Sequence, residues 1–264
     1  MMKSLKKVEN HITKWLLSYL KNSNMRGFVV GVSGGIDSAV TSTLCAKTGE
    51  NLLVLEMPIK QEVSQISRAQ EHISWLKSNF KNVKSHTLPL DSVFETFSRS
   101  LPITQDKETQ FLSLANTRAR LRMTCLYYFA SLHGYLVVGT GNKVEDFGVG
   151  FYTKYGDGGV DLSPIADLLK TDVYRLAIQM EIIKSIQKAA PTDGLWGDER
   201  TDEDQLGASY PELEWAMQSY KKNENPVLFN DRQKIVYQIY LKHHKQNQHK
   251  MIPIPICKIP QNLL

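Results

Sequence analysis

The stretch FVVGVSGGIDSAV, residues 28–40, decides the fold of the chain. Its first five residues, 28–32, form a short continuous apolar run, which is typical of a buried parallel strand. Glycines and a serine follow, and a helical pattern then begins at Ile36 and continues to about Lys47. This order predicts an anion site, because the amide groups of the turn and the partial positive charge of the helix end face the same place.

The rest of the chain repeats the alternation of strand and helix. Further strands are expected at residues 52–57, 83–88 and 135–139, and helices at 62–79, 108–132 and 170–180. Gly134 is expected to end the longest helix, and helical stretches at 8–20 and from 232 onward lie outside the alternation. The order predicts a doubly wound parallel sheet with helices on both faces, in a single domain 1–264. Ligands are then expected at the carboxyl ends of the strands.

Composition excludes several classes of protein. With 264 residues, 42% apolar and 22% charged, the chain is not a disordered one. Three scattered cysteines are too few for a disulfide framework or a cysteine-based zinc site. No signal peptide and no run of 18 apolar residues is found, so we expect a cytoplasmic protein without a membrane span.

The charge is modest but unevenly distributed. A net charge of +5, without interleaved aromatic and basic residues, argues against a nucleic-acid-binding module. Residues 191–215 carry eight acids against Arg200 alone, whereas residues 221–264 carry eight bases against two acids. One interpretation is that residues 196–208 form a lid with hinges at Gly194, Gly197 and Gly207, which orders over the site when substrates bind. The other is a pair of solvated segments.

The glycine-rich turn is not a Walker A loop. That motif needs a lysine directly before its Ser or Thr, and here Asp37 precedes Ser38. A carboxylate beside a phosphate site suggests a bridging Mg²⁺ ion. Glu145 comes after the strand expected at 135–139, and parallel strands end at the same edge of the sheet. We therefore expect Asp37 and Glu145 to be the metal ligands. The segment GTGNKV at 139–144 lacks the last glycine of a dinucleotide fingerprint.

The segment SGGIDS at 33–38 resembles the signature of the ATP-pyrophosphatase (PP-loop) superfamily, whose fold is adenine-nucleotide alpha-hydrolase-like. Further segments resemble the ammonia-dependent NAD synthetases over residues 28–255; they are GTGNKVE (139–145), TKYGDGGVD (153–161), LSPI (162–165), KT (170–171), PTDGL (191–195), DEDQLG (202–207) and HK (249–250). The resemblance implies a C–N ligase that acts in the last step of NAD biosynthesis. It implies amidation of deamido-NAD by ammonia through an acyl-adenylate, giving NAD, AMP and pyrophosphate.

The resemblance also implies a homodimer and a set of site residues. It places ATP at Gly31, Val32, Ser33, Gly34, Gly35, Ile36, Asp37, Ser38, Thr140, Lys170 and Thr192. It places deamido-NAD at Arg120, Lys154, Asp161, His249 and Lys250. Two residues are expected to be catalytic: Asp157, between two glycines, to bind or deprotonate ammonia, and Lys170 to stabilise phosphate charge.

Three arginines alternate at 118, 120 and 122, and on a helix they point in different directions. The resemblance selects Arg120 for the dinucleotide, so Arg118 and Arg122 are expected at the surface or at an interface. The same helix carries Tyr127, Tyr128 and Phe129, whose side chains point in different directions around it. One core-facing side cannot bury all three, and this favours a homodimer.

Alternatives remain open at this point. One is another adenylating PP-loop enzyme that acts on a nucleotide or on tRNA, and another is a non-catalytic nucleotide sensor. Seven residues separate Glu145 from Thr153, one more than in many members of the family that the chain resembles. Residues 1–27 are too few for a glutaminase domain. Ammonia is therefore expected to arrive free or from another protein.

Overall fold

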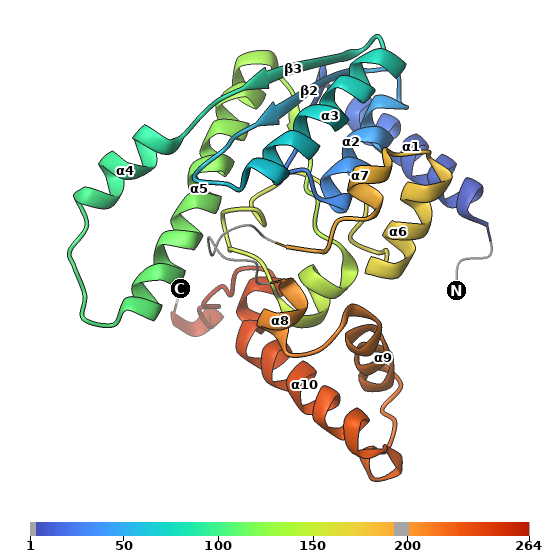
Figure 1. The fold of residues 1–264 in the computed structure, drawn as a ribbon. Helices are drawn as coiled ribbons and strands as arrows, with labels where there is room; N and C mark the ends of the chain where they lie inside the picture. The colour runs from blue at the N-terminus through green and yellow to red at the C-terminus, as the bar shows by residue number, and fades with distance from the viewer. Residues whose placement is uncertain (1–3, 193–200, 264) are drawn as a thin grey trace.

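The computed structural model describes residues 4–192 and 201–263, and within these ranges four parallel strands form one sheet (Figure 1). The strands are β1 (Gly27–Gly31), β2 (Asn51–Glu56), β3 (Val83–Thr87) and β4 (Leu136–Val137), in the spatial order β3-β2-β1-β4. β1 pairs with β2 from Gly27 opposite Asn51. It also pairs with β4, and both neighbours run parallel to it. β1 is therefore a central strand, and its carboxyl end lies between those of its neighbours, at the edge of the sheet where ligands are expected.

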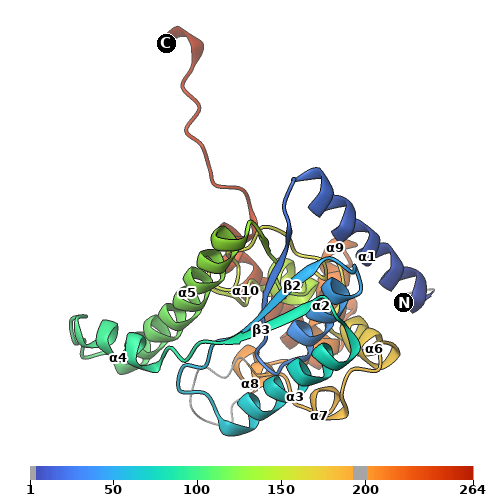
Figure 2. The same ribbon diagram turned by 90° about the horizontal axis from the view of Figure 1, so that it is seen from above.

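Side chains of β1 alternate between two hydrophobic clusters. Phe28 and Val30 pack with α1 (Leu5–Asn22), α2 (Ile36–Ala46), α3 (Val63–Asn79) and α6 (Lys170–Gln179). Val29 points the other way and packs with α4 (Asp91–Arg99) and α5 (Lys107–His133). The view from above shows α5 on one side of the sheet and α2 and α3 on the other (Figure 2). The expected parallel sheet with helices on both faces is confirmed.

A buried glutamate joins three helices on the first of these faces. Glu9 of α1 is 3% exposed, and its carboxylate pairs with Lys47 at 2.7 Å, directly after α2. It also accepts a hydrogen bond of 2.6 Å from Gln179 of α6. The helix that precedes the strand–helix alternation therefore packs against α2 and α6 on this face of the sheet.

The C-terminal part of the chain forms a third cluster below the sheet (Figure 1). Here α9 (Tyr210–Lys221) and α10 (Asp231–Met251) pack against a π-helix, η1 (Val144–Val149). Short helices complete the chain: α7 (Lys184–Gln187), α8 (Asp202–Leu206), η2 (Pro226–Leu228) and η3 (Gln261–Leu263). After α10 the chain runs away from the body in an extended form (Figure 2), with Ile254 and Ile256 exposed.

Most expected elements lie within two or three residues of the observed bounds, and Gly134 ends α5 with a φ of 67°. The strand expected at 135–139 is shorter, because Val138 makes only an isolated bridge to Leu162. The helices α4, α7, α8 and α9 and the π-helix were not predicted from the hydrophobic pattern. Within the described ranges, no helix has the length and apolar character needed to cross a bilayer.

Candidate active site

The glycine-rich turn after β1 has a fixed shape. Ser38 Oγ accepts a hydrogen bond from the Ser33 amide (3.2 Å) and donates to the Gly35 carbonyl (3.0 Å). Gly34 has a φ of +81°, and a Cβ there would lie 2.5 Å from the Gln65 carbonyl oxygen, so only glycine fits. Gly35 is the N-cap of α2 and offers no side-chain cap. The amides at the start of α2 therefore remain available to an anion.

This turn forms one wall of a cavity of about 450 Å³ at the carboxyl ends of β1 and β4. The cavity brings together every residue expected to bind ATP or metal, and with them Asp157 and Lys250. Four residues expected to bind deamido-NAD are not among its described lining residues: Arg120, Lys154, Asp161 and His249.

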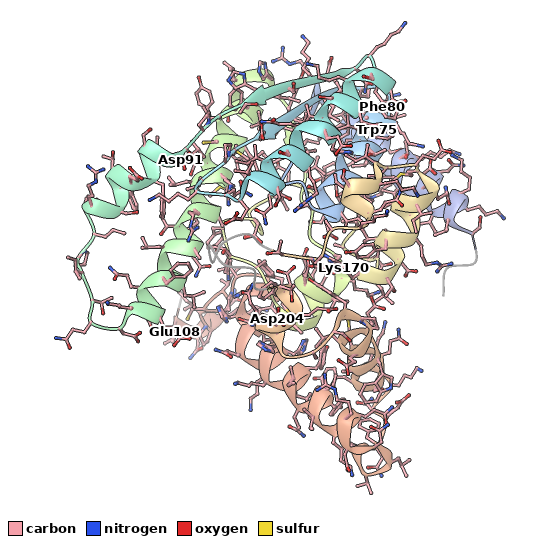
Figure 3. The ribbon with its side chains drawn as sticks, in the orientation of Figure 1. Trp75, Phe80, Asp91, Glu108, Lys170 and Asp204 are labelled. Carbon is pink, nitrogen blue, oxygen red and sulfur yellow. The ribbon has the colours of Figure 1, made fainter. Side chains whose placement is uncertain are left out.

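Lys170 lies at the centre of the site, between the sheet and the C-terminal helices (Figure 3). Its ammonium group is 2.5 Å from Asp37 Oδ2 and 2.9 Å from Glu145 Oε1. Its side chain is only 4% exposed. Burial alone would lower the pKa of Lys170, but the attraction of the two carboxylates outweighs it and raises the pKa above the usual value.

The two carboxylates respond differently to this shared lysine. Burial dominates at Asp37 and raises the pKa of that carboxyl despite Lys170. At Glu145 burial also opposes ionisation, but Lys170 and the hydroxyl of Tyr210 together hold the pKa below its usual value. Of the two carboxyls, Glu145 is thus the one held more firmly in its charged form.

The donor set fits a Mg²⁺ ion. Asp37 and Glu145 converge on one cation, and both lie in the cavity wall beside the phosphate turn. Carboxylate oxygens completed by phosphate and water are the ligands that Mg²⁺ prefers. The cation that the two carboxylates hold in this structure is the Lys170 ammonium.

A buried asparagine two residues before the π-helix connects its first turn to Asp37. Asn142 Oδ1 accepts hydrogen bonds from the amides of Val144 (3.1 Å) and Glu145 (3.2 Å), and its Nδ2 donates to Asp37 Oδ1 (3.2 Å). A π-helix holds one residue more per hydrogen-bonded turn than an α-helix, and such turns often occur at functional sites.

Two further carboxyls line the cavity. Asp157 is an exposed residue of the cavity wall, and the protein around its carboxyl raises the pKa of that group; its Oδ1 accepts a hydrogen bond of 2.9 Å from the Thr153 amide. Asp146 was missed by the sequence analysis. Burial, with the nearby charges of Glu145, Asp157 and Asp37, raises the pKa of Asp146 to about 8. The only signal for it in the sequence is its position directly after Glu145.

The residues outside the cavity form a second group. Arg120 donates to the Lys154 carbonyl (3.3 Å), and Lys154 Nζ donates to the His249 carbonyl (2.7 Å), so these three connect α5 with the end of α10. Asp161 accepts hydrogen bonds from the Val137 amide (2.7 Å) and the Tyr127 hydroxyl (2.9 Å), which ties it to the end of β4.

Lys250 belongs to the cavity instead. Its ammonium donates to the carbonyls of Gly150 (2.9 Å) and Tyr152 (2.8 Å). These bonds attach the last turn of α10 to the segment that follows the π-helix.

The surface or interface position expected for Arg118 is wrong. Arg118 is only 6% exposed, and its guanidinium lies over the rings of Phe94 and Phe111, because α4 covers this side of α5. Arg122 is half-buried, donates to the Met57 carbonyl at 2.9 Å and lines the cavity. Contacts with α4 could not be foreseen, since that helix was not expected.

The proposed lid at 196–208 lies partly outside the described residues, and its described part, 201–208, contains α8. The segment that follows brings an unforeseen tyrosine to the site. The Tyr210 hydroxyl donates to Glu145 Oε1 at 2.6 Å, and its ring centroid lies 4.7 Å from Lys170 Nζ. A capping box of Ser209 and Glu212 marks its place at the start of α9. That signal, S-x-x-E, is visible in the sequence.

Comparison with known proteins agrees with this geometry. The family model described as NAD synthase matches residues 8–253. The NH(3)-dependent NAD(+) synthetase of Mycoplasma genitalium is 38% identical over 250 residues, which is 94% of each chain. That of Methanosarcina mazei is 33% identical over 232 residues, 86% of this chain and 87% of the other.

Two solved structures share the whole fold. The NMN synthetase from Francisella tularensis superposes with a TM-score of 0.82 at 29% identity, covering 98% of this chain and 100% of that one. The NH3-dependent NAD synthetase from Campylobacter jejuni, in complex with the nitrate ion, gives 0.77 at 25% identity, covering 97% and 100%.

Proposed function

Because the chain belongs to the NAD synthase family, it is a ligase that forms NAD in an ATP-dependent reaction, and we propose that it amidates deamido-NAD with ammonia through an acyl-adenylate. The observation that carries this route is the convergence of the phosphate turn, Lys170 and two carboxylates on one cavity. Amidation needs such a site, because the oxygen of a carboxylate is a poor leaving group whereas AMP is a good one.

The first step joins the acceptor to AMP. An oxygen of the nicotinic carboxylate attacks the α-phosphorus of ATP, and the bond to the β-phosphate oxygen breaks to release pyrophosphate. The amides at the start of α2, unpartnered within the described residues, would hold phosphate oxygens, and Lys170 turns from its carboxylates to the charge that develops on the phosphates. Asp37 and Glu145 would hold Mg²⁺, which supplies charge neutralisation for the departing pyrophosphate.

In the second step ammonia attacks the acyl carbon, the C–O bond to AMP breaks, and the nitrogen passes one proton to the departing AMP phosphate, which leaves the amide of NAD. Asp157 lies on the same cavity, with its Oδ1 held by the Thr153 amide. Its raised pKa suits a group that binds ammonium and accepts its proton, so that neutral ammonia is the nucleophile.

A second acceptor has specific support. The fold superposes on an NMN synthetase, and three residues expected to contact the dinucleotide, Arg120, Lys154 and His249, lie together outside the cavity. The same two steps on nicotinic acid mononucleotide, giving NMN, are therefore the second candidate. The chemistry in the cavity is the same for both acceptors. They differ only in the AMP portion, which deamido-NAD carries and nicotinic acid mononucleotide lacks.

A homodimer is part of the proposal. On α5, Tyr128 and Leu132 are 63% and 56% exposed and lie one turn apart. Beyond α10, Ile256 is 82% exposed on the extended C-terminal segment. Exposed apolar side chains on these two parts of the chain favour an isologous contact between two copies. Three free cysteines agree with the proposed cytoplasmic location.

The decisive experiment measures pyrophosphate release after ATP is mixed with ammonium and one acceptor at a time. Deamido-NAD is expected to give pyrophosphate, AMP and NAD in equal amounts. A higher kcat/KM with nicotinic acid mononucleotide would favour the second candidate. Release with tRNA alone, or no release with either nicotinate acceptor, would overturn the proposal.

A further inference from the structure

A tyrosine from the C-terminal cluster holds both charged partners of the phosphate site. Glu145 Oε1 accepts one hydrogen bond from Lys170 Nζ (2.9 Å) and another from the Tyr210 hydroxyl (2.6 Å). The Tyr210 ring also faces the ammonium group, 4.7 Å from its centroid. One side chain therefore contacts the carboxylate through its hydroxyl and the cation through its ring.

Tyr210 is itself firmly placed. It is only 3% exposed within the third hydrophobic cluster, and its amide donates to Glu203 Oε1 at 2.8 Å. The capping box of Ser209 and Glu212 fixes the first turn of α9, and Arg232 of α10 holds Glu212 through two hydrogen bonds of 2.7 and 2.8 Å. A side chain with so many constraints can hold its neighbours without moving itself.

The same helix supports the lysine from a second direction. Glu214 accepts hydrogen bonds from the Thr171 amide (2.9 Å) and the Thr171 hydroxyl (2.8 Å), at the first turn of α6. Lys170 is the neighbour of Thr171 and the first residue of that helix. Helix α9 thus holds the backbone next to Lys170 through Glu214, and it also supplies the Tyr210 ring that the ammonium faces.

We propose that Tyr210 is a positioning residue for the phosphate site. Its hydroxyl keeps the Glu145 carboxylate in place while Lys170 turns from the carboxylates to the phosphate, and its ring stabilises the ammonium along this movement. Without the hydroxyl, Glu145 Oε1 would keep neither of these two hydrogen bonds once Lys170 departs. The inference rests on the proposed ATP-dependent function of the cavity.

Three variants separate the parts of this role. Tyr210→Phe removes the hydroxyl and keeps the ring, Tyr210→Leu removes both, and Tyr237→Phe is the control. Tyr237 is a buried tyrosine of the same cluster, 7% exposed, whose ring packs on Phe229; among the described contacts it makes none with Glu145 or Lys170. A purely structural effect of losing a buried hydroxyl would appear in Tyr237→Phe as well.

Two readouts are needed, and one does not depend on turnover. Calorimetry in which preformed Mg·ATP is titrated into the chain, without an acceptor, measures the binding of Mg²⁺ together with its nucleotide. Tyr210→Phe is expected to weaken this binding by about tenfold, the usual effect of a lost hydrogen bond to a charged group. In steady-state kinetics, kcat is expected to fall by about tenfold, with the KM for the acceptor unchanged within a factor of about two. Tyr210→Leu should lower kcat further.

The outcomes distinguish the positioning role from the function on which it rests. If the unaltered chain releases no pyrophosphate with any acceptor, the proposed function fails. If the unaltered chain is active and Tyr210→Phe matches Tyr237→Phe in Mg²⁺ binding and in kcat, the positioning role is overturned. A loss of thermal stability in Tyr210→Phe without a change in Mg²⁺ binding would likewise reduce Tyr210 to a packing residue.

Discussion

The carboxyl group of Asp146 occupies the space in which any side chain at Gly141 would begin: a Cβ there would overlap both carboxyl oxygens. Gly141→Ala is therefore expected to displace Asp146 within the cavity. Because the displaced group is the end of a side chain, the free energy of unfolding should fall by only about 1 kcal/mol, at the low end for overpacking. We expect kcat to fall by at least about tenfold, since the carboxyls of the cavity lose their arrangement. Gly148→Ala is the control, because its Cβ would meet Met217 only in ordinary contact. Equal activity of both variants would contradict the prediction.

Asp37→Asn is expected to leave the fold intact and to abolish Mg²⁺-dependent turnover. The substitution removes one carboxylate from Lys170 but leaves the pair with Glu145 at 2.9 Å, so no buried charge is left alone. Thermal unfolding should therefore change little, while pyrophosphate release should be lost. Normal release by a folded Asp37→Asn protein would remove this residue from the metal site.

A buried histidine predicts a loss of stability in acid. His72 is fully buried beside Ser42, with 3.0 Å between its Nε2 and the hydroxyl, and burial lowers its pKa from 6.5 to about 4. Above pH 6.5 the ring is neutral in both folded and unfolded chains, and the stability is fully present. Below that value the unfolded chain takes up a proton that the folded chain refuses, so about 3 kcal/mol is lost as the pH falls toward about 4.

The measurement for His72 is urea unfolding across this pH range. His72→Gln, which has no titrating ring, should show a shallower dependence of the unfolding free energy on pH. Identical slopes for the two proteins would show that other groups cause the acid sensitivity.

The proposed homodimer predicts that changes at two exposed apolar sites weaken association. The unaltered chain, of 30.0 kDa, should sediment with twice its own mass at micromolar concentration. Tyr128→Glu on α5 and Ile256→Asp on the C-terminal segment should each weaken the dimer by at least about tenfold. Val227→Glu is the matched control, since Val227 is also exposed, at 79%, but lies in the turn between α9 and α10. A fully active chain that sediments only as a monomer would rule out an obligate dimer.

The sheet and the phosphate turn could be predicted from the sequence because both depend on local patterns. The apolar run of β1, the glycines after it and the start of α2 lie within 20 residues, and their order alone indicates what they form. The approach of Asp37 to Glu145 followed from topology, since parallel strands end at one edge. Lys170 was expected near phosphate, but its place between these two carboxylates depends on how α6 packs, which no local pattern records.

The site residues that could not be predicted are those whose partners lie far away in the sequence. Tyr210 meets Glu145 over a separation of 65 residues, and Glu214 meets Thr171 over 43. Both lie on α9, which turns these side chains toward α6 only after its apolar face has packed on α10 and the π-helix. Arg118 was misplaced for a similar reason, because the helix that covers it was not foreseen.

The two carboxylates around Lys170 also determine its reactivity toward amine reagents. Acylating and carbamylating compounds attack only the unprotonated amine, which a buried lysine with a raised pKa almost never presents. A lysine at the surface such as Lys242 would be modified long before it. A chemical labelling map of this chain would therefore place its central lysine among the least reactive, and low reactivity there would reflect engagement by acids rather than a lack of function.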